Sequence, residues 1–304
     1  MNPSLPRRVA LIEVGPRDGL QNESVPVSTD MRVELVDRLT DAGFPQVEVG
    51  SFVSPKWVPQ MADTAEVMAR IRRGAGTRYS VLTPNLKGFE GALAARADEV
   101  VIFGAASESF SQRNINCSIA ESIARFEPVA RAAKEHRMRL RASVSCSLGC
   151  PYEGAVAPSQ VAEVVQRCAD LGCDMIDVAD TIGTGTPRST QAVFEAALRI
   201  VPAGRLSGHF HDTYGMAVAN VYAGLEMGIS TFQSSVAGLG GCPYAKGATG
   251  NVATEDLLYL LDGLGIETGV SLPKVVAIGQ WISSLLGRRA HARAGNALAA
   301  RQAA

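Results

Sequence analysis

Histidine is scarce in this chain and long apolar runs are absent, and these gaps narrow the possible functions before any motif is considered. Only four histidines occur in 304 residues. No segment approaches the roughly 20 apolar residues that span a bilayer, so we expect no membrane partner. Lys and Arg are scattered and the formal net charge is −1, so we expect no nucleic-acid partner. Hydrophobic residues, at 46%, suffice for a large globular core.

Paired cysteine motifs and a secretion signal are also missing. No C-x-x-C pair occurs among the six cysteines, which argues against a structural zinc site and against a disulfide framework. The opening MNPSLPRRVALIEVG has an apolar stretch too short for a secretion signal, and we interpret it as a first strand. We therefore expect a cytoplasmic protein with reduced cysteines.

Short β-rich runs alternate with stretches of helical apolar spacing along almost the whole chain. Eight such runs are present: 9–15, 46–52, 78–83, 99–105, 140–146, 175–181, 205–213 and 231–238. Helical spacing marks 31–43, 64–74, 122–136, 159–172, 190–201 and 220–228. This alternation predicts an α/β fold with a parallel sheet, and eight units without a linker favour a closed (β/α)8 TIM barrel. An open doubly wound sheet is the alternative, disfavoured because no G-x-G-x-x-G follows the first strand.

Two further helices are predicted beyond the last strand, over 255–265 and 272–287. We expect one catalytic domain over 1–288, consisting of the barrel and these C-terminal helices. The Ala/Arg-rich segment 289–304 is predicted to be a tail, either a frayed helix or mobile.

The stretch GHFHDTYG places two of the four histidines, His209 and His211, two positions apart. In a strand they project from the same face, which is a spacing typical of metal ligands. The alternative is a pair of core histidines packed beside Phe210. Catalytic residues of such barrels gather at the carboxyl ends of the strands, where Asp18 joins the two histidines in a two-histidine, one-carboxylate set. Such a set binds Mg²⁺ or Mn²⁺, or else Zn²⁺, Co²⁺ or Fe²⁺.

A glycine-rich loop, SVAGLGGCPYAKGATGN, follows the eighth strand and contains Cys242. Its composition allows a phosphate-binding loop, as is common after the last strands of a barrel. The other interpretation is a mobile lid that brings a thiol to the site.

Several motifs together resemble the 3-hydroxy-3-methylglutaryl-CoA lyase family. They occur in the family's order over nearly the whole chain: VGPRDGLQNE, VEVGSFVSPKWVPQMAD, SESFSQRNINCSI, VSCSLGCPYEG, ADTIGTGTP, HFHDTYGMAVAN and SVAGLGGCPYAKGATGNVATED. The cysteine-containing glycine loop is the most specific of these motifs.

The resemblance implies a metal-dependent retro-Claisen cleavage of an acyl-CoA to acetyl-CoA and a keto acid such as acetoacetate. The metal, Mg²⁺ or Mn²⁺, would be bound by Asp18, His209, His211 and Asn251. Arg17 would stabilise charge on the thioester oxygen and Cys242 would protonate the departing enolate, with Glu48 and Asp180 acting as base or orienting groups. Arg17 could instead form a structural ion pair. The resemblance also implies a homodimer.

Residues expected to contact the substrate are Arg17, Gln21, Ser51, Ser143 and Asp177. Two of them depart from the family pattern: Ser143 replaces a tyrosine and Asp177 replaces a serine. The first substitution enlarges the acyl pocket, and the second repels a substrate carboxylate unless it is paired or protonated. We therefore expect a substrate that is bulkier or differently charged than 3-hydroxy-3-methylglutaryl-CoA.

Two other positions depart from the family, and two other functions remain open. Gly50 replaces a threonine, and Ser24 replaces a basic residue that contacts CoA phosphates, a role that Arg288 and Arg289 could assume. The alternative functions are a condensing synthase of the isopropylmalate or homocitrate type and a non-catalytic acyl-CoA-binding relative. Neither explains the cysteine loop together with the full set of polar residues.

Overall fold

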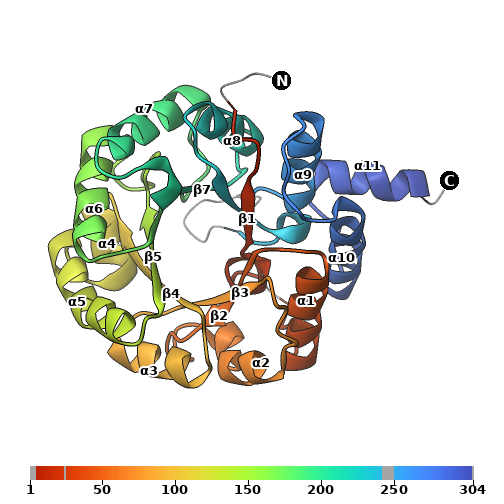
Figure 1. Ribbon diagram of the computed structural model, residues 1–304, viewed down its shortest axis with the longest axis horizontal. Helices are drawn as coiled ribbons and strands as arrows, with labels where there is room; N and C mark the ends of the chain where they lie inside the picture. Colours follow the sequence, from red (N-terminus) through yellow and green to blue (C-terminus); the bar gives the residue numbers. More distant parts are fainter. Residues whose placement is uncertain (1–4, 24, 242–249, 303–304) are drawn as a thin grey trace.

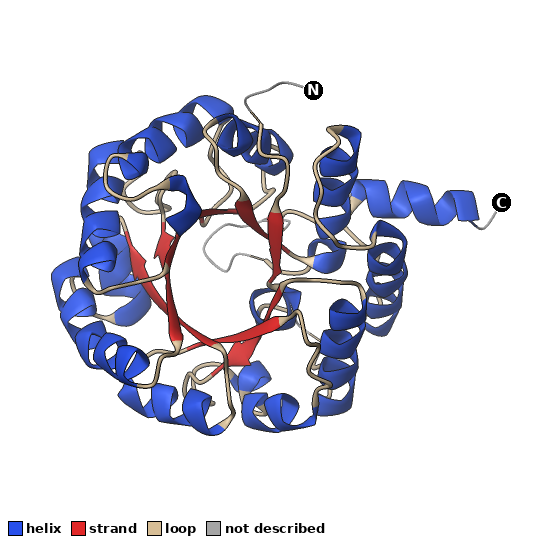
Figure 2. Cartoon of the chain, in the orientation of Figure 1, coloured by secondary structure: helices blue, strands red, loops and turns tan. Residues whose placement is uncertain are grey.

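Eight parallel strands close into a barrel in chain order, with β1 paired to both β2 and β8. A computed structural model describes residues 5–23, 25–241 and 250–302. The helices surround the ring of strands (Figures 1 and 2). The strands are β1 Ala10–Glu13, β2 Gln46–Ser51, β3 Arg78–Leu82, β4 Glu99–Ala105, β5 Arg139–Ser145, β6 Met175–Asp180, β7 Leu206–Phe210 and β8 Thr231–Ser234. The predicted TIM barrel and all eight predicted strands are confirmed.

Among the described residues, one α-helix follows each strand except β4, which is followed by two, and β8, which is followed by three. They are α1 Thr29–Asp41, α2 Thr64–Arg70, α3 Leu86–Ala94, α4 Glu108–Ile115, α5 Ile119–Glu135, α6 Pro158–Asp170, α7 Pro187–Leu198, α8 Ala217–Glu226, α9 Thr254–Gly263, α10 Leu272–Leu285 and α11 Arg293–Gln302. Side-chain caps start several of them: Ser28 accepts a hydrogen bond from the Met31 amide, and Ser118 with Glu121 forms a capping box. Among the described residues, no helix has the length and apolar character needed to cross a membrane.

The apolar core lies between the strands and the helices, whereas much of the barrel interior is polar. Leu35 of α1 and Val47 of β2 are fully buried in this outer core. The interior holds a charged group instead, Arg141 with Glu48, Glu99 and Asp177, each at most 1% exposed. Interiors of such barrels are ordinarily filled by branched apolar side chains, so this one departs from the rule.

The first and last described segments of the chain both contact the rest of the fold. The amide of Val9 donates to the carbonyl of Glu267, whose own amide donates to the carbonyl of Arg7. Helix α11 occupies most of the segment predicted to be a frayed helix or a mobile tail. This helix, the last element of the chain, packs against α9 and α10 (Figure 1).

Candidate active site

Asp18, His209 and His211 lie together at the carboxyl ends of β1 and β7. Their ligand atoms are all within 4.8 Å of one another. Oδ2 of Asp18 is 4.0 Å from Nε2 of His209 and 3.9 Å from Nε2 of His211. The two imidazole rings are 5.2 Å apart, as expected for alternate residues on one face of a strand. Two imidazole nitrogens and a carboxylate form a donor set suited to a divalent cation.

The protonation states of these side chains favour metal binding. Burial lowers the pKa of His209, so its imidazole is neutral and offers a lone pair at neutral pH. Burial alone raises the pKa of Asp18, but Arg17 and the two histidines outweigh this effect and hold that pKa well below its usual value. The site therefore presents an ionised carboxylate and a neutral imidazole without any change of protonation.

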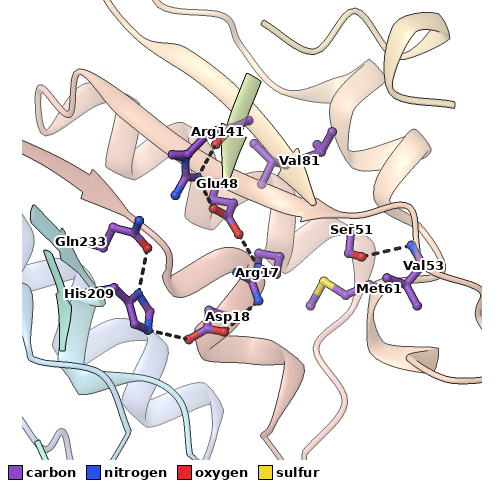
Figure 3. Close-up of polar contacts among 12 residues, drawn as sticks. Arg17, Asp18, Glu48, Ser51, Val53, Met61, Val81, Arg141, His209 and Gln233 are labelled. Atoms are coloured by element: carbon purple, nitrogen blue, oxygen red, sulfur yellow. Dashed lines mark hydrogen bonds and ion pairs between the residues drawn. The ribbon is translucent and has the colours of Figure 1, made fainter. Parts of the chain in front are cut away.

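Gln233 orients His209. Its Oε1 lies 2.8 Å from Nδ1 of His209, so the ring donates there and turns Nε2 toward Asp18 (Figure 3). The β7–β8 register brings the two residues together, since His209 lies opposite Gln233. Gln233 was not among the predicted site residues, although a polar residue within β8, the strand that follows the H-x-H motif, is a usable signal.

Asn251 is adjacent to the cluster through an isolated bridge to His211. Its Nδ2 donates to Oδ2 of Asp18 at 2.8 Å and to the carbonyl of Leu239 at 3.2 Å. Rotating the side-chain amide of Asn251 by a half-turn about χ2 would place Oδ1 where Nδ2 now lies. A ligand oxygen is thus within reach of the cluster.

Arg17 lies in a single π-helical turn, Gly15–Gly19, directly after β1. Its Nη1 donates to Asp18 at 2.8 Å, and its Nε donates to Glu48. Burial alone lowers the pKa of Arg17, but the carboxylates of Glu48 and Asp18 raise it above its usual value. Within the described part of the chain Nη2 has no hydrogen-bond partner. Arg17 is therefore ion-paired on one side, as a structural arginine would be, and presents unused donors beside the metal cluster.

Glu48 and Asp180 differ as candidate bases. Burial raises the pKa of Glu48, but Arg17 and Arg141 outweigh it and lower that pKa below its usual value. Burial raises the pKa of Asp180 to about 6, and its oxygens accept from the amides of Thr184 and Gly185 at 3.1 and 2.9 Å. Asp180 is thus the more basic of the two carboxylates, whereas both oxygens of Glu48 are occupied by guanidinium groups.

The residues expected to bind substrate occupy different environments. Gln21 is half-buried just beyond the π-helical turn. The Ser51 hydroxyl accepts from the Val53 amide at 3.1 Å and so holds the loop after β2 (Figure 3). Ser143 is half-buried on β5. Asp177 is fully buried, accepting from Arg141 at 2.8 Å and from the hydroxyl of Ser207. Asp177 is therefore paired with a cation, and this pairing is a condition under which it does not repel a substrate carboxylate.

Cys242 and Ser24 lie outside the described residues. The backbone on either side of the 242–249 segment is described and forms a narrow neck, because a Cβ on Gly250 would lie 2.4 Å from the carbonyl oxygen of Gly240. Gly250 has a φ of +93° and Gly240 a φ of +123°, so glycine is required at both positions. This neck joins the glycine loop directly to Asn251.

The two basic residues considered for CoA phosphates are placed differently. Arg288 forms an ion pair with Glu23 at 2.6 Å. Arg289 is exposed. Arg289 is the more available cation of the two.

A closed parallel barrel with a two-histidine, one-carboxylate cluster beside an ion-paired arginine defines a metal-binding barrel enzyme. The family model for HMGL-like proteins matches residues 8–282, and the chain belongs to this family. A Pseudomonas aeruginosa protein, 3-hydroxy-3-isohexenylglutaryl-CoA/hydroxy-methylglutaryl-CoA lyase, is 57% identical over 298 residues, covering 98% of this chain and 99% of that protein.

Two solved structures extend the comparison. The crystal structure of hydroxymethylglutaryl-CoA lyase from Pseudomonas aeruginosa superposes with a TM-score of 0.96 at 57% identity, covering 98% of this chain and 99% of the other. An HMG-CoA lyase from an Acinetobacter species, solved in complex with coenzyme A and 3-methylmalate, superposes with a TM-score of 0.92 at 34% identity, covering 98% and 96%. The family that the sequence motifs resemble is thereby confirmed.

Proposed function

We propose that this chain is a divalent-metal-dependent carbon–carbon lyase that cleaves 3-hydroxy-3-methylglutaryl-CoA to acetyl-CoA and acetoacetate. The observation that carries the proposal is the position of Arg17, which presents free donors beside the cluster of Asp18, His209 and His211. The named activities of the relatives are of this kind. Asp18, His209, His211 and the amide oxygen of Asn251 would hold Mg²⁺ or Mn²⁺.

The reaction breaks the bond between the carbinol carbon and the thioester α-carbon. A bound divalent cation lowers the pKa of a hydroxyl group that it ligates. Asp180, with a pKa of about 6, accepts the hydroxyl proton in this proposal. The bonding electrons move to the α-carbon as the keto acid forms. Arg17 stabilises the negative charge on the thioester oxygen, and Cys242 returns a proton to that carbon.

Substrates with a longer group at the tertiary carbon are a second part of the proposal. Ser143 is small and half-buried, and the Pseudomonas relative carries an isohexenyl substrate in its name. Asp177 is paired and does not oppose a substrate carboxylate. We expect a Ser143→Tyr variant to lose the isohexenyl substrate more than the methyl one. If the ratio of kcat/KM for the isohexenyl substrate to kcat/KM for the methyl substrate were the same in the wild type and in Ser143→Tyr, this role of Ser143 would be contradicted.

The decisive experiment measures acetyl-CoA release from 3-hydroxy-3-methylglutaryl-CoA with Mg²⁺ or Mn²⁺ and with EDTA, for the wild type and for Cys242→Ala. Metal-dependent release that is lost in the variant supports both the reaction and the thiol's role. Metal binding without cleavage of this or the isohexenyl substrate would overturn the proposed function. The homodimer is also a proposal, and light scattering of the purified protein tests it.

A further inference from the structure

Arg141 projects from β5 into the barrel interior and contacts three carboxylates from three other strands. Its Nε donates to Glu99 of β4 and its Nη1 to Asp177 of β6, both at 2.8 Å, and its Nη2 donates to Glu48 of β2. Arg141 is 1% exposed. Burial alone lowers its pKa, but the three carboxylates raise the pKa well above the usual value for arginine. The guanidinium is therefore charged and fixed in all three directions of its planar fork.

Glu48 connects this buried group to the active site. One of its oxygens accepts from Arg141, and the other accepts from Nε of Arg17 (Figure 3). Glu48 is fully buried, so bulk solvent does not reach its carboxylate. Since both oxygens are engaged, the orientation of Glu48 sets the plane of the Arg17 guanidinium and hence the direction of Nη2.

Asp177 sets the orientation of Arg141. The hydroxyl of Ser207 donates to one oxygen of Asp177, and the other oxygen remains for Arg141. Without Asp177, the guanidinium of Arg141, which repels that of Arg17, would keep only Glu48 and Glu99 as carboxylate partners. Asp177 accepts from Nη1 of Arg141, and this bond keeps Nη2 directed at Glu48.

The geometry points to Asp177 and Arg141 as positioning residues, which act through Glu48 to aim the guanidinium of Arg17 at the reacting group. This inference rests on the proposed function for the role of Arg17. It gives Asp177 an indirect role, because neither of its oxygens faces the metal cluster as a free acceptor.

A double-mutant cycle tests the inference in the full-length protein. Asp177→Asn keeps the shape of the side chain and removes its charge, and Arg141→Lys keeps the charge and removes the fork. We expect kcat to fall about tenfold in the first and about a hundredfold in the second, with KM and Mn²⁺ affinity changed less than about twofold, because the charge on the thioester oxygen develops only in the transition state. In an Arg17→Lys background, Asp177→Asn should have almost no further effect on kcat. Additive losses would overturn the inference.

A matched control separates positioning from stability. Arg32 on α1 is also 1% exposed and is ion-paired to Asp63, with further bonds to the carbonyls of Gln60 and Val49, and none of its bonds reaches Arg17. Arg32→Lys should lower the thermal midpoint about as much as Arg141→Lys and leave kcat unchanged. Equal loss of kcat in the two variants would mean that Arg141 has a structural role only.

A second readout does not depend on activity. In protein labelled with ¹⁵N-arginine, the Nε–H signal of Arg17, assigned with Arg17→Lys, reports its bond to Glu48. Asp177→Asn should shift this signal and speed its hydrogen exchange, while Arg32→Lys should leave it in place. An unchanged signal in Asp177→Asn overturns the inference even if the wild type cleaves no acyl-CoA, whereas a wild type without cleavage but with the shifted signal contradicts only the proposed function.

Discussion

At the scale of single residues, the ligand properties of His209 depend on a neighbour that is itself no ligand. Oε1 of Gln233 accepts a hydrogen bond from Nδ1 of His209, and this leaves the lone pair on Nε2, which is directed toward Asp18. Replacing Gln233 by leucine removes the acceptor, and we expect Mn²⁺ to bind about 10–100-fold more weakly because such outer partners fix the tautomer and the ring. Isothermal titration with Mn²⁺ measures this change. Gln233→Glu, which keeps an oxygen there, should bind at least as well as the wild type, and a leucine variant with unchanged affinity would refute the assignment.

Gly50 departs from the family's threonine for a reason that the structure makes visible. A Cβ there would lie 2.4 Å from Oγ1 of Thr64 and 3.0 Å from Nη2 of Arg32. We expect Gly50→Ala to reduce the free energy of unfolding by about 1–3 kcal/mol through overpacking. Gly76→Ala is the matched control, since nothing lies within 4 Å of its Cβ position. Thermal unfolding monitored by circular dichroism compares the two, and equal midpoints would contradict the expectation.

The sequence predicts individual residues of the site unequally. Asp18, His209 and His211 could be grouped in advance, because strand alternation and the common end of a parallel barrel constrain where they meet. Arg141 was not predicted as a site residue, because no periodicity distinguishes a strand with a charged interior face from one with an apolar interior face. Its three carboxylate partners come from strands that only the closed barrel brings together.

At the scale of elements, β1 and α9 each supply a buried carboxylate to the turn after β8. Glu13 accepts from the amides of Gly15 and Val236 at 2.8 and 2.9 Å, and Glu255 accepts from the amide of Ala237 at 3.0 Å. Burial raises the pKa of Glu13 to about 7 and that of Glu255 to about 8. These two side chains therefore connect the π-helical turn of the site with the start of the glycine loop.

Their raised pKa values predict how stability depends on pH. In the unfolded chain both carboxyls have a pKa near the ordinary value of 4.5, whereas the folded protein keeps their protons up to about pH 7 and about pH 8. The stabilisation is complete below that unfolded value and is lost as the pH rises through the folded values, by on the order of 1–3 kcal/mol per group. The Glu13→Gln, Glu255→Gln double variant should show a flatter decline of the thermal midpoint between about pH 5 and about pH 8.

An exposed carboxylate provides the control for this pH dependence. Glu90 is exposed, and Glu90→Gln should retain the decline of the wild type. A double variant whose midpoint falls as steeply as that of Glu90→Gln would show that the two buried carboxyls are ionised at neutral pH.

Elements are more predictable than the contacts between them. All eight strands follow from β-rich runs, because strands buried on both faces stand out as apolar segments. Helices α3 and α4 are short, at 9 and 8 residues, and were not predicted. Helix α3 also contains Gly88 and Gly91, and Gly91 leaves space for the ring of Phe52, within 2.7 Å of its Cβ position. Tertiary packing selects those glycines at a cost in helix propensity.

At the scale of the whole molecule, the segment after α10 reaches back to the active-site end of the barrel. The amide of His291 donates to the carbonyl of Ala237 at 2.9 Å, and Asp256 accepts from the amides of Arg293 and Ala294 at 3.2 and 2.6 Å. Ala292 is fully buried. The predicted division into a barrel over 1–288 and a tail over 289–304 remains a prediction, and these contacts provide a direct test.

Two truncations make that test. Ending the chain after Arg288 removes the contacts to Ala237 and Asp256, and we expect the thermal midpoint to fall by about 5 °C or more, with loss of lyase activity. Ending it after Leu298 removes, among the described residues, half-buried Ala299 and exposed Ala300 and Arg301, and should change neither property. Wild-type activity and midpoint after the truncation at Arg288 would instead support a dispensable tail.

The anchoring of the amino end to Glu267 has a practical consequence for handling the enzyme. The pairing of Arg7 and Val9 with Glu267 holds the chain at the start of β1, on the face of the barrel opposite the metal cluster. A purification tag or a surface tether fused ahead of this segment therefore points away from the substrate entrance. Immobilised through its amino end, the enzyme would face solution with its working side open.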